Sequence, residues 1–412
     1  MTEHTAGPMI DHATPAETPA DVPLVLHVIP TTVARGAQRE ARALADRLDR
    51  PGVRSHRVLS LFDGPAEVTA DISLHYRGGR AAGTGLSPGL VVRLRSALAR
   101  FDPTVVVAHG SEPLKYLVPA MAGRHRPLVY YAIGTYSGGP GRFQLRLWQT
   151  LMARADVVAA EGHEVLDEVV TRLGVPEARA VLAPNGRDPE LFHPRGPDAP
   201  GPEPAEPEPP RVVFVGALTP GKRPDLFIDL VARLRADGVG VRAELIGDDP
   251  LRGELADAAR SAGVEMRGPR ADVADQLRRA DVMVFTSDAA GEGMPGVLIE
   301  AGLSGLPVVA TDVPGVRSIV ADGDTGVIVA VGDPDGLAAA TTRLVGDPGL
   351  RAALGRAARQ RCLDRFSLAA VEERWLSFLQ PLVDAGADPT VHRPPRRPRI
   401  DSGGMTTPDH RA

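Results

Sequence analysis

The chain has 412 residues, which is too long for one ordinary hydrophobic core and suits two domains. Its composition, 43% hydrophobic and 24% charged, is that of a globular protein, and a net charge of -5 lacks the basic excess of nucleic-acid binding. Cys362 is the only cysteine, which excludes an internal disulfide framework and a cysteine-rich metal site and fits a reducing cytoplasm.

Neither end of the chain predicts a targeting segment. Residues 1–21 are polar and Pro-rich, without the basic start and apolar stretch of a signal peptide, and residues 387–412 are rich in Pro and Arg. No uninterrupted apolar run approaches the roughly 18 residues of a membrane-spanning helix. We therefore expect two disordered tails and a cytoplasmic protein, with peripheral contact at the inner face of the membrane left open.

Short apolar strands alternate with helices through the first half of the chain. The strands are expected at Leu24–Ile29, Ser55–Leu61, Ile72–Tyr76, Thr104–Ala108, Leu128–Ala132, Asp156–Ala160 and Val181–Ala183. The helices between them are expected at Ala37–Asp49, Pro88–Arg100, Glu112–Ala122, Arg142–Ala153 and His163–Leu173. Such alternation predicts a parallel sheet with helices on both faces.

A second series of the same kind begins at Arg211. Its strands are expected at Val212–Gly216, Val241–Ile246, Val264–Arg267, Val282–Phe285, Pro307–Ala310 and Thr325–Val329. Its helices are expected at Arg223–Ala236, Leu251–Ala262, Val273–Arg279, Gly296–Ser304 and Pro334–Leu344, with terminal helices at Leu350–Cys362 and Leu368–Leu382.

A Pro-rich stretch at residues 195–210 separates the two series, because a packed core cannot be built from its composition. We therefore predict an N-terminal domain at 22–194, a linker at 195–210, a C-terminal domain at 211–365 and a final helix at 366–386 that can pack back on the N-terminal domain. The predicted fold class is α/β, with two Rossmann-like domains whose parallel sheets face each other across a cleft.

Residues 287–300 predict a ligand site, since a strand leads through a glycine-rich loop, S-D-A-A-G-E-G-M-P, into a helix. The free N–H groups and positive dipole of such a helix start bind anions. Glu292 in the loop and Glu300 on the second helical turn could hold hydroxyls of a sugar nucleotide. The alternative, two unrelated surface acids, is weakened by the surrounding glycines, Pro295 and the following G-L-P-V-V-A-T-D.

Lys222 lies in F-V-G-A-L-T-P-G-K-R, where a strand ends at Gly216 and the next helix begins. A cation at a helix start is mildly unfavourable with the helix dipole. Lys115 and Lys222 are the only lysines, so a lysine in this place indicates a function. It could bind a diphosphate and stabilise the charge that builds as a glycosyl bond breaks. The alternative is a plain surface lysine.

Two candidates belong to the first half. His109 is expected just past the end of a buried strand at the cleft edge, where it could hydrogen-bond a sugar or transfer a proton near pH 7. A lone structural histidine is the alternative. Gly36 could let the backbone approach a phosphate or acceptor, with Arg35 and Arg39 as phosphate partners, unless this segment is an ordinary strand-to-helix turn.

Other patterns do not favour different chemistry. The Asp-x-Asp pairs at 322/324 and 333/335 lie in turn sequences, so we expect no metal site there. No G-x-G-x-x-G follows the first strand of either half, which weakens a dinucleotide oxidoreductase. The expected helix at Arg142–Ala153 could touch a membrane or an acceptor, although packing in the core is the simpler interpretation.

Residues 22–382 resemble a retaining glycosyltransferase of family 4, which has the GT-B fold. The most specific similarity is E-G-M-P-G-V-L-I-E-A-G-L-S-G-L-P-V-V-A-T-D-V-P-G from Glu292, which resembles the family's E-G-(F/M)-P-x-x-x-x-E-A stretch. V-G-A-L-T-P-G-K-R-P-D, G-D-D-P-L-R at Gly247–Arg252, P-N-G-R-D-P-E-L-F-H-P at Pro184–Pro194 and His109 are also similar to the family.

The resemblance implies that Glu300 binds the ribose, Lys222 the diphosphate and Glu292 the donor sugar, and that His109 contacts the sugar near the reacting carbon. His109, Lys222 and Glu292 are therefore the expected catalytic residues. The expected donor-binding residues are Gly36, Gly216, Lys222, Arg223, Gly268, Arg270, Glu292, Gly293, Met294, Pro295, Gly296 and Glu300.

Enzymes of this family transfer a sugar with retention and without a metal or other cofactor, and the leaving phosphate takes the proton of the acceptor. The expected partners are a nucleotide-diphosphate sugar and a sugar, lipid-linked or small-molecule acceptor, with no nucleic acid. The sequence departs from the family pattern at two positions. Ala217 stands where the family often has an arginine, and Arg223 could take over the role of that arginine. Arg35 stands in place of the first glycine of the family's G-G-A loop. A sugar-nucleotide epimerase and a degenerate, non-catalytic binding subunit stay open as alternatives.

Overall fold

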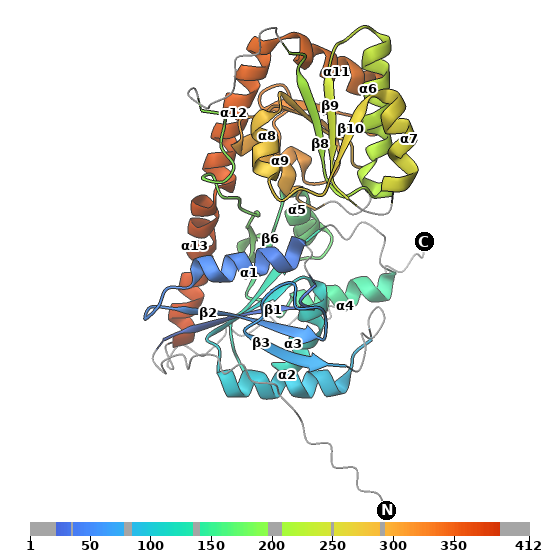
Figure 1. Cartoon of the computed structure of the whole chain (residues 1–412). Coiled ribbons are helices and arrows are strands. Elements are labelled where there is room, and N and C mark those ends of the chain that lie inside the picture. Colours follow the sequence, from blue (N-terminus) through green and yellow to red (C-terminus); the bar gives the residue numbers. More distant parts are fainter. Residues whose placement is uncertain are drawn as a thin grey trace, which may run out of the picture.

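The computed structural model describes residues 22–33, 36–77, 85–134, 141–196, 208–248, 251–288 and 293–387. These residues form two parallel sheets, each with helices packed on it, one above the other in Figure 1. The predicted α/β class is therefore confirmed.

The first sheet has the strand order β3-β2-β1-β4-β5-β6-β7, and the described pairings are all parallel. Its strands are β1 (Leu24–Ile29), β2 (Ser55–Phe62), β3 (Ile72–Tyr76), β4 (Val105–His109), β5 (Leu128–Ala132), β6 (Val157–Ala160) and β7 (Ala180–Leu182). Its helices are α1 (Gly36–Leu48), α2 (Pro88–Phe101), α3 (Ser111–Ala120), α4 (Arg142–Met152), α5 (His163–Thr171) and the 3₁₀ turn η1 (Glu177–Arg179).

The second sheet has the order β10-β9-β8-β11-β12-β13. Its strands are β8 (Arg211–Val215), β9 (Arg242–Ile246), β10 (Val264–Gly268), β11 (Val282–Phe285), β12 (Val308–Thr311) and β13 (Gly326–Val329). Its helices are the 3₁₀ turn η2 (Pro220–Lys222), α6 (Pro224–Ala236), α7 (Arg252–Ala262), α8 (Val273–Arg279), α9 (Gly296–Leu303), α10 (Val316–Ile319), α11 (Pro334–Gly346) and α12 (Pro348–Phe366).

Each sheet has one hydrophobic layer on either face, because successive side chains of a strand point to opposite sides. In β1, Leu26 and Val28 pack in the core that includes α2, α3 and α4, whereas Val25 packs with α1 and the last helix. His27 and His109 interrupt otherwise apolar strands, yet both are buried. These two histidines point to the face of the sheet that α1 covers.

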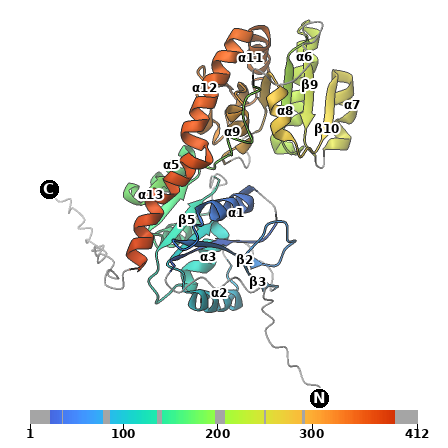
Figure 2. The same ribbon diagram turned by 60° about the vertical axis from the view of Figure 1, so that its left-hand side comes forward.

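The last helix, α13 (Leu368–Ala387), joins the two halves. It follows α12 after a single residue, Ser367, and Figure 2 shows the two helices running in line along the upper and the lower half. Trp375 and Leu379 of α13 are buried against the first sheet. The chain therefore crosses back to the first domain and fixes its C-terminal helix there.

The observed elements differ from the expected ones mainly at their ends. One difference matters for function: β4 includes His109, which the sequence had predicted just beyond the strand. Short elements such as α10 and η2 were not predicted, because three or four residues carry no periodic signal. Among the described helices, none is both long enough and apolar enough to cross a membrane.

Candidate active site

Three glycines stand at the carboxyl ends of β8, β9 and β10. The N–H of Gly216 donates to the carbonyl of Ile246 at 3.0 Å, and that of Gly247 donates to the carbonyl of Gly268 at 3.1 Å. A Cβ on Gly247 would lie 1.8 Å from the carbonyl oxygen of Gly216, so no larger residue fits there. Two predicted donor residues, Gly216 and Gly268, thus lie on either side of Gly247 at the edge where parallel sheets bind ligands.

Lys222 is brought to the same edge by the turn η2. The hydroxyl of Thr286, just after β11, donates to the carbonyls of Lys222 at 3.0 Å and Arg223 at 2.8 Å. The N–H of Asp288 donates to the carbonyl of Gly221 at 2.9 Å, and Lys222 Nζ lies 5.6 Å from the ring centre of Phe285. Lys222 therefore lies beside the start of the loop that leads to α9.

The two arginines expected at the donor bind carboxylates of their own domain. Arg223, which has a left-handed backbone at φ 50°, donates from Nε and Nη2 to the carboxylate of Asp225 at 2.7–3.0 Å. Arg270 donates to both oxygens of Asp272 at 2.7 and 2.8 Å, and this holds the pKa of the Asp272 carboxyl well below its usual range. Each guanidinium therefore already has an anionic partner in this structure.

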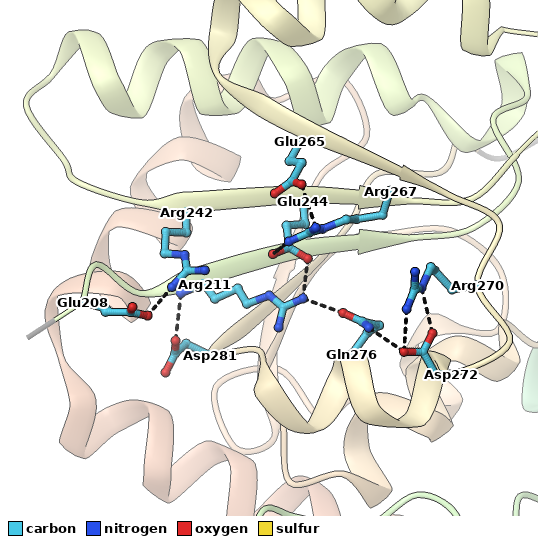
Figure 3. Close-up of polar contacts among 10 residues, drawn as sticks. All are labelled: Glu208, Arg211, Arg242, Glu244, Glu265, Arg267, Arg270, Asp272, Gln276 and Asp281. Carbon is cyan, nitrogen blue, oxygen red and sulfur yellow. Dashed lines mark hydrogen bonds and ion pairs between the residues drawn. The ribbon is translucent and has the colours of Figure 1, made fainter. Parts of the chain in front are cut away.

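Arg270 stands at the end of a polar network that crosses the second sheet, as Figure 3 shows. The buried carboxylate of Glu244 on β9 accepts from Arg211 and Arg267. Arg211 also donates to Gln276 at 2.6 Å, and Gln276 donates to Asp272, the partner of Arg270, at 2.8 Å. Because the network reaches from the sheet to Asp272, it supports the turn on which Arg270 lies.

The loop before α9 lies against the N-terminal domain. A Cβ on Gly293 would lie 2.0 Å from Glu161 Oε1, and that oxygen accepts from the N–H of Gly134 at 2.5 Å. A Cβ on Gly315 would lie 1.8 Å from the carbonyl oxygen of Gly293, so the loop is closely packed on its own domain as well. Met294 is buried in the second domain, and Pro295 is the residue before the first turn of α9.

Glu300 on the second turn of α9 forms an ion pair across the domain junction. Arg187, in the turn that follows β7, donates from Nε to Glu300 Oε1 at 2.7 Å and from Nη1 to Oε1 of Glu40 on α1. A Cβ on Gly296 would lie 2.0 Å from Arg187 Nη2, so a larger residue there would have to displace the end of this guanidinium. Burial raises the pKa of Glu40, with Arg187 opposing the shift.

Further contacts join the domains next to this ion pair. Ser318 of α10 accepts from the N–H of His163 at 3.1 Å and donates to Glu164 at 3.1 Å, both at the start of α5. On the other side, the backbone of Arg187 bonds to Phe366 at 2.9 Å and to Leu368 at 3.1 Å. The predicted donor side and the N-terminal domain are therefore in direct contact.

The described residues include only part of the two predicted glycine-containing loops. Glu292 lies outside the described residues, as does Arg35. Gly36 is the first residue of α1, and a Cβ there would meet nothing within 4 Å. The expected catalytic and acceptor roles of these residues stay predictions.

His109 is the last residue of β4 instead of the residue just past it, and it bonds to another histidine. It is 2% exposed, and its Nε2 lies 2.9 Å from Nδ1 of His27. His27 Nε2 lies 2.9 Å from His56 Nδ1. Burial lowers the pKa of His109 to about 3, so it is neutral near pH 7 and suited to hydrogen bonding instead of proton transfer there.

The sequence did not point to Arg187, Glu40 and Glu161 at the domain junction, nor to His27 and His56, which bond within the first sheet next to His109. A signal existed for His27, since a histidine inside the apolar run L-V-L-H-V-I must be buried and hydrogen-bonded. Arg187 lies in the stretch P-N-G-R-D-P-E-L-F-H-P that resembles the family, but its ion-pair partners could not be predicted, because Glu40 and Glu300 are 147 and 113 residues away in the chain. Among the described residues, no group of His, Cys, Asp or Glu could hold a metal ion.

Comparison with known proteins finds a glycosyltransferase family model that matches each half of the chain. The family described as Glycosyltransferase Family 4 matches residues 34–191, and the family described as Glycosyl transferases group 1 matches residues 209–347.

Curated relatives match over most of the chain. The α-maltose-1-phosphate synthase of Mycobacterium tuberculosis is 31% identical over 299 residues, which cover 67% of this chain and 72% of the relative. The D-inositol 3-phosphate glycosyltransferase of Kineococcus radiotolerans is 31% identical over 277 residues, covering 58% of this chain and 62% of the relative.

Solved structures share the fold. HepE of Anabaena in complex with UDP and glucose superposes with a TM-score of 0.69 at 21% identity, covering 86% of this chain and 99% of HepE. A glycosyltransferase from Rickettsia africae superposes with a TM-score of 0.73 at 16% identity, covering 88% and 99%. This likeness confirms the predicted two-domain GT-B architecture.

Proposed function

Because the chain belongs to glycosyltransferase family 4, we propose that it transfers a hexose-type sugar from a nucleotide-diphosphate sugar to an acceptor, with retention of the anomeric configuration. The proposed acceptor is a sugar, a lipid-linked group or another small molecule, and the reaction uses no metal or other cofactor. The proposed place of action is the cytoplasm, including the inner face of the membrane.

The observation that carries the proposal is the position of Glu300. Its carboxylate lies at the domain junction, on the second turn of the helix whose N-terminal loop contains Gly293, and Arg187 bonds to its Oε1. A carboxylate fixed beside a helix start suits a ligand that presents hydroxyls next to an anion. The ribose and diphosphate of a sugar nucleotide have that combination.

The proposed chemistry places each group in a definite role. The bond between the anomeric carbon and the diphosphate oxygen breaks, and the acceptor oxygen forms its bond to that carbon on the same face. The leaving phosphate oxygen takes the acceptor's proton. Lys222, beside the end of β11, stabilises the charge that grows on the diphosphate.

A donor screen tests the proposal. UDP-, GDP- and ADP-sugars are added singly to the full chain, and the thermal midpoint is measured, since a ligand that binds the native state raises it. UDP-glucose is the first probe, because HepE is solved with UDP and glucose. Mass spectrometry of reactions with candidate acceptors then separates transfer from epimerisation, and the anomeric configuration of the product is read by NMR.

The variant Glu300→Gln tests the role of the Glu300 carboxylate in donor binding. Its control is Glu254→Gln, at an exposed position of α7. We expect Glu300→Gln to lose donor stabilisation and turnover, and Glu254→Gln to keep both. Turnover should also persist in a chelator. Wild-type turnover by Glu300→Gln would contradict the proposed donor site, and stabilisation by none of the nucleotides would favour a non-catalytic binding subunit.

The described part of α4 supports a test of membrane contact. Phe143 is 77% exposed, whereas Trp148 and Met152 of the same helix are buried. Phe143 and Arg146, three residues apart on α4 and both exposed, provide the apolar and the basic side chain with which a helix can bind an anionic membrane surface. Flotation with vesicles that contain anionic lipid, compared between wild type and Phe143→Ser, tests the proposed location, and equal binding of both would contradict this contact.

A further inference from the structure

Four side chains form a hydrogen-bonded row beneath α1, across β2, β1 and β4. Arg54 Nε donates to His56 Nε2 at 3.0 Å. His56 Nδ1 lies 2.9 Å from His27 Nε2, and His27 Nδ1 lies 2.9 Å from His109 Nε2. All four residues are buried. The row thus connects a guanidinium near α13 to the predicted sugar-contacting histidine.

The row has one direction, because its first member can only donate. A guanidinium has no acceptor atom, so Nε2 of His56 must accept. A neutral imidazole has one N–H and one acceptor nitrogen, so His56 carries its proton on Nδ1 and donates to His27. The same reasoning places the proton of His27 on Nδ1. His109 then accepts at Nε2 and carries its own proton on Nδ1.

This direction requires that all three imidazole rings are neutral, and burial keeps them neutral. It lowers the pKa of His56 to about 3, with Arg54 contributing, and that of His109 to about 3. Burial also holds the pKa of His27 well below its usual range. No ring of the row is therefore protonated on both nitrogens near pH 7.

The free end of the row is a buried donor. Nδ1 of His109 has no hydrogen-bond partner among the described residues. His109 lines a cavity of about 30 Å³ between α1, α13 and the turn before Arg187, together with Glu40, Tyr131 and Asn185. A space of this size is large enough for a water-sized group such as a hydroxyl. A buried N–H favours such an acceptor strongly.

We propose that Arg54, His56 and His27 are positioning residues that fix the tautomer of His109, so that Nδ1 donates a hydrogen bond to a hydroxyl oxygen of the bound sugar. The sugar contact rests on the proposed function, whereas the tautomer depends only on the row itself. A His109 that could take either tautomer would present its donor to the sugar for only part of the time.

Nitrogen NMR of the full chain, labelled with ¹⁵N at histidine, tests the tautomer directly. Protonated and unprotonated ring nitrogens differ in chemical shift, and the signals of His109 are identified by their loss in His109→Asn. We expect the proton on Nδ1 in the wild type. A proton on Nε2 of His109 would overturn the proposal, whatever the activity of the enzyme.

Two variants at Arg54 separate positioning from simple packing. Arg54→Lys keeps a group that can only donate, whereas Arg54→Gln can also accept and so releases the direction of the row. Both lose the guanidinium that donates to His56 and to Gln380 of α13 at the same time, so they share the structural cost of that loss. We expect His109 to keep the Nδ1 proton in Arg54→Lys and to show both tautomers in Arg54→Gln.

Turnover with the donor found in the screen completes the test. Because only molecules with the proton on Nδ1 of His109 make this hydrogen bond, kcat of Arg54→Gln should fall relative to Arg54→Lys by the same factor as the Nδ1 tautomer seen by NMR, about twofold for equal tautomers, with little change in the donor KM. Equal kcat values for the two variants would overturn the positioning role. If the wild type transfers no sugar from any donor, the sugar contact is wrong, and the NMR experiment still decides the tautomer.

Discussion

Arg187 Nε lies 2.7 Å from Glu300 Oε1, so the N-terminal domain holds the carboxylate expected to bind the ribose. The same guanidinium bonds to Glu40 of α1, and its backbone pairs with the segment between α12 and α13. One arginine therefore connects the donor helix, the N-terminal domain and the point where the chain crosses back. Domain movement during a catalytic cycle would have to keep or break this ion pair.

Removing the guanidinium of Arg187 should destabilise the folded protein. The side chains of Glu40 and Glu300 are 22% and 18% exposed, so Arg187→Met leaves two largely buried carboxylates without their partner. We expect the free energy of unfolding to fall by about 3 kcal/mol, measured by urea denaturation. The double variant Arg187→Met with Glu40→Leu should recover part of this loss. A double variant that is less stable than the single one would contradict the ion pair.

The buried histidines predict a pH dependence of stability. The pKa of His56 is lowered to about 3 in the folded state, so between that value and its usual pKa near 6.5 only the unfolded chain takes up the proton. Stability is therefore lost as the pH falls from about 6.5 toward 3, by up to about 1.4 kcal/mol per pH unit for each such ring.

His56→Asn tests this pH dependence, with His125→Gln at an exposed site as control. We expect His56→Asn to be less stable than the wild type at pH 7.5, because it disturbs the histidine row, but to lose less stability between pH 7 and pH 5. His125→Gln should follow the wild type. Urea denaturation at each pH provides the comparison, and parallel profiles for all three proteins would refute the assignment.

Lys222 and Arg223 are adjacent cations with different expected effects. Lys222→Met should lower kcat/KM about 100-fold or more, since it removes the proposed stabilisation of the leaving diphosphate. Arg223→Gln should lower it much less, because the guanidinium of Arg223 already binds Asp225. Initial rates at several donor concentrations measure both. An equal loss in the two variants would show that Arg223 turns to the donor in the working enzyme.

Gly315 should be needed for the shape of the donor loop. A Cβ at this position would lie 1.8 Å from the carbonyl oxygen of Gly293, and its φ of +84° disfavours any other residue. We expect Gly315→Ala to lower the free energy of unfolding by on the order of 3 kcal/mol and to weaken donor binding.

Gly253→Ala is the matched control for Gly315→Ala, because its added Cβ meets nothing within 4 Å and alanine favours the helix in which it lies. We expect a small gain in thermal midpoint and unchanged donor binding there. If Gly315→Ala behaves like Gly253→Ala in both measurements, the contact with Gly293 does not shape the loop.

Much of the fold could be predicted from local patterns. The apolar run at Leu24–Ile29 and the helix at Val273–Arg279 were predicted with their observed limits, because continuous apolar strands and periodic helices have strong local signals. The motif from Glu292 to Glu300 indicated a sugar-nucleotide enzyme, and the family comparison supports that class. The roles of the individual site residues stay predictions.

By itself, the sequence determined that two parallel α/β domains form and that the glycine loop leads into a helix carrying Glu300. Only the tertiary structure showed that Arg187 binds Glu300 and that His109 ends a row that begins at Arg54. The physical reason is that strand and helix formation depend on residues close in the chain. A hydrogen bond between residues far apart in the chain depends on the order of the strands and on how the domains meet. No local sequence pattern specifies either of these.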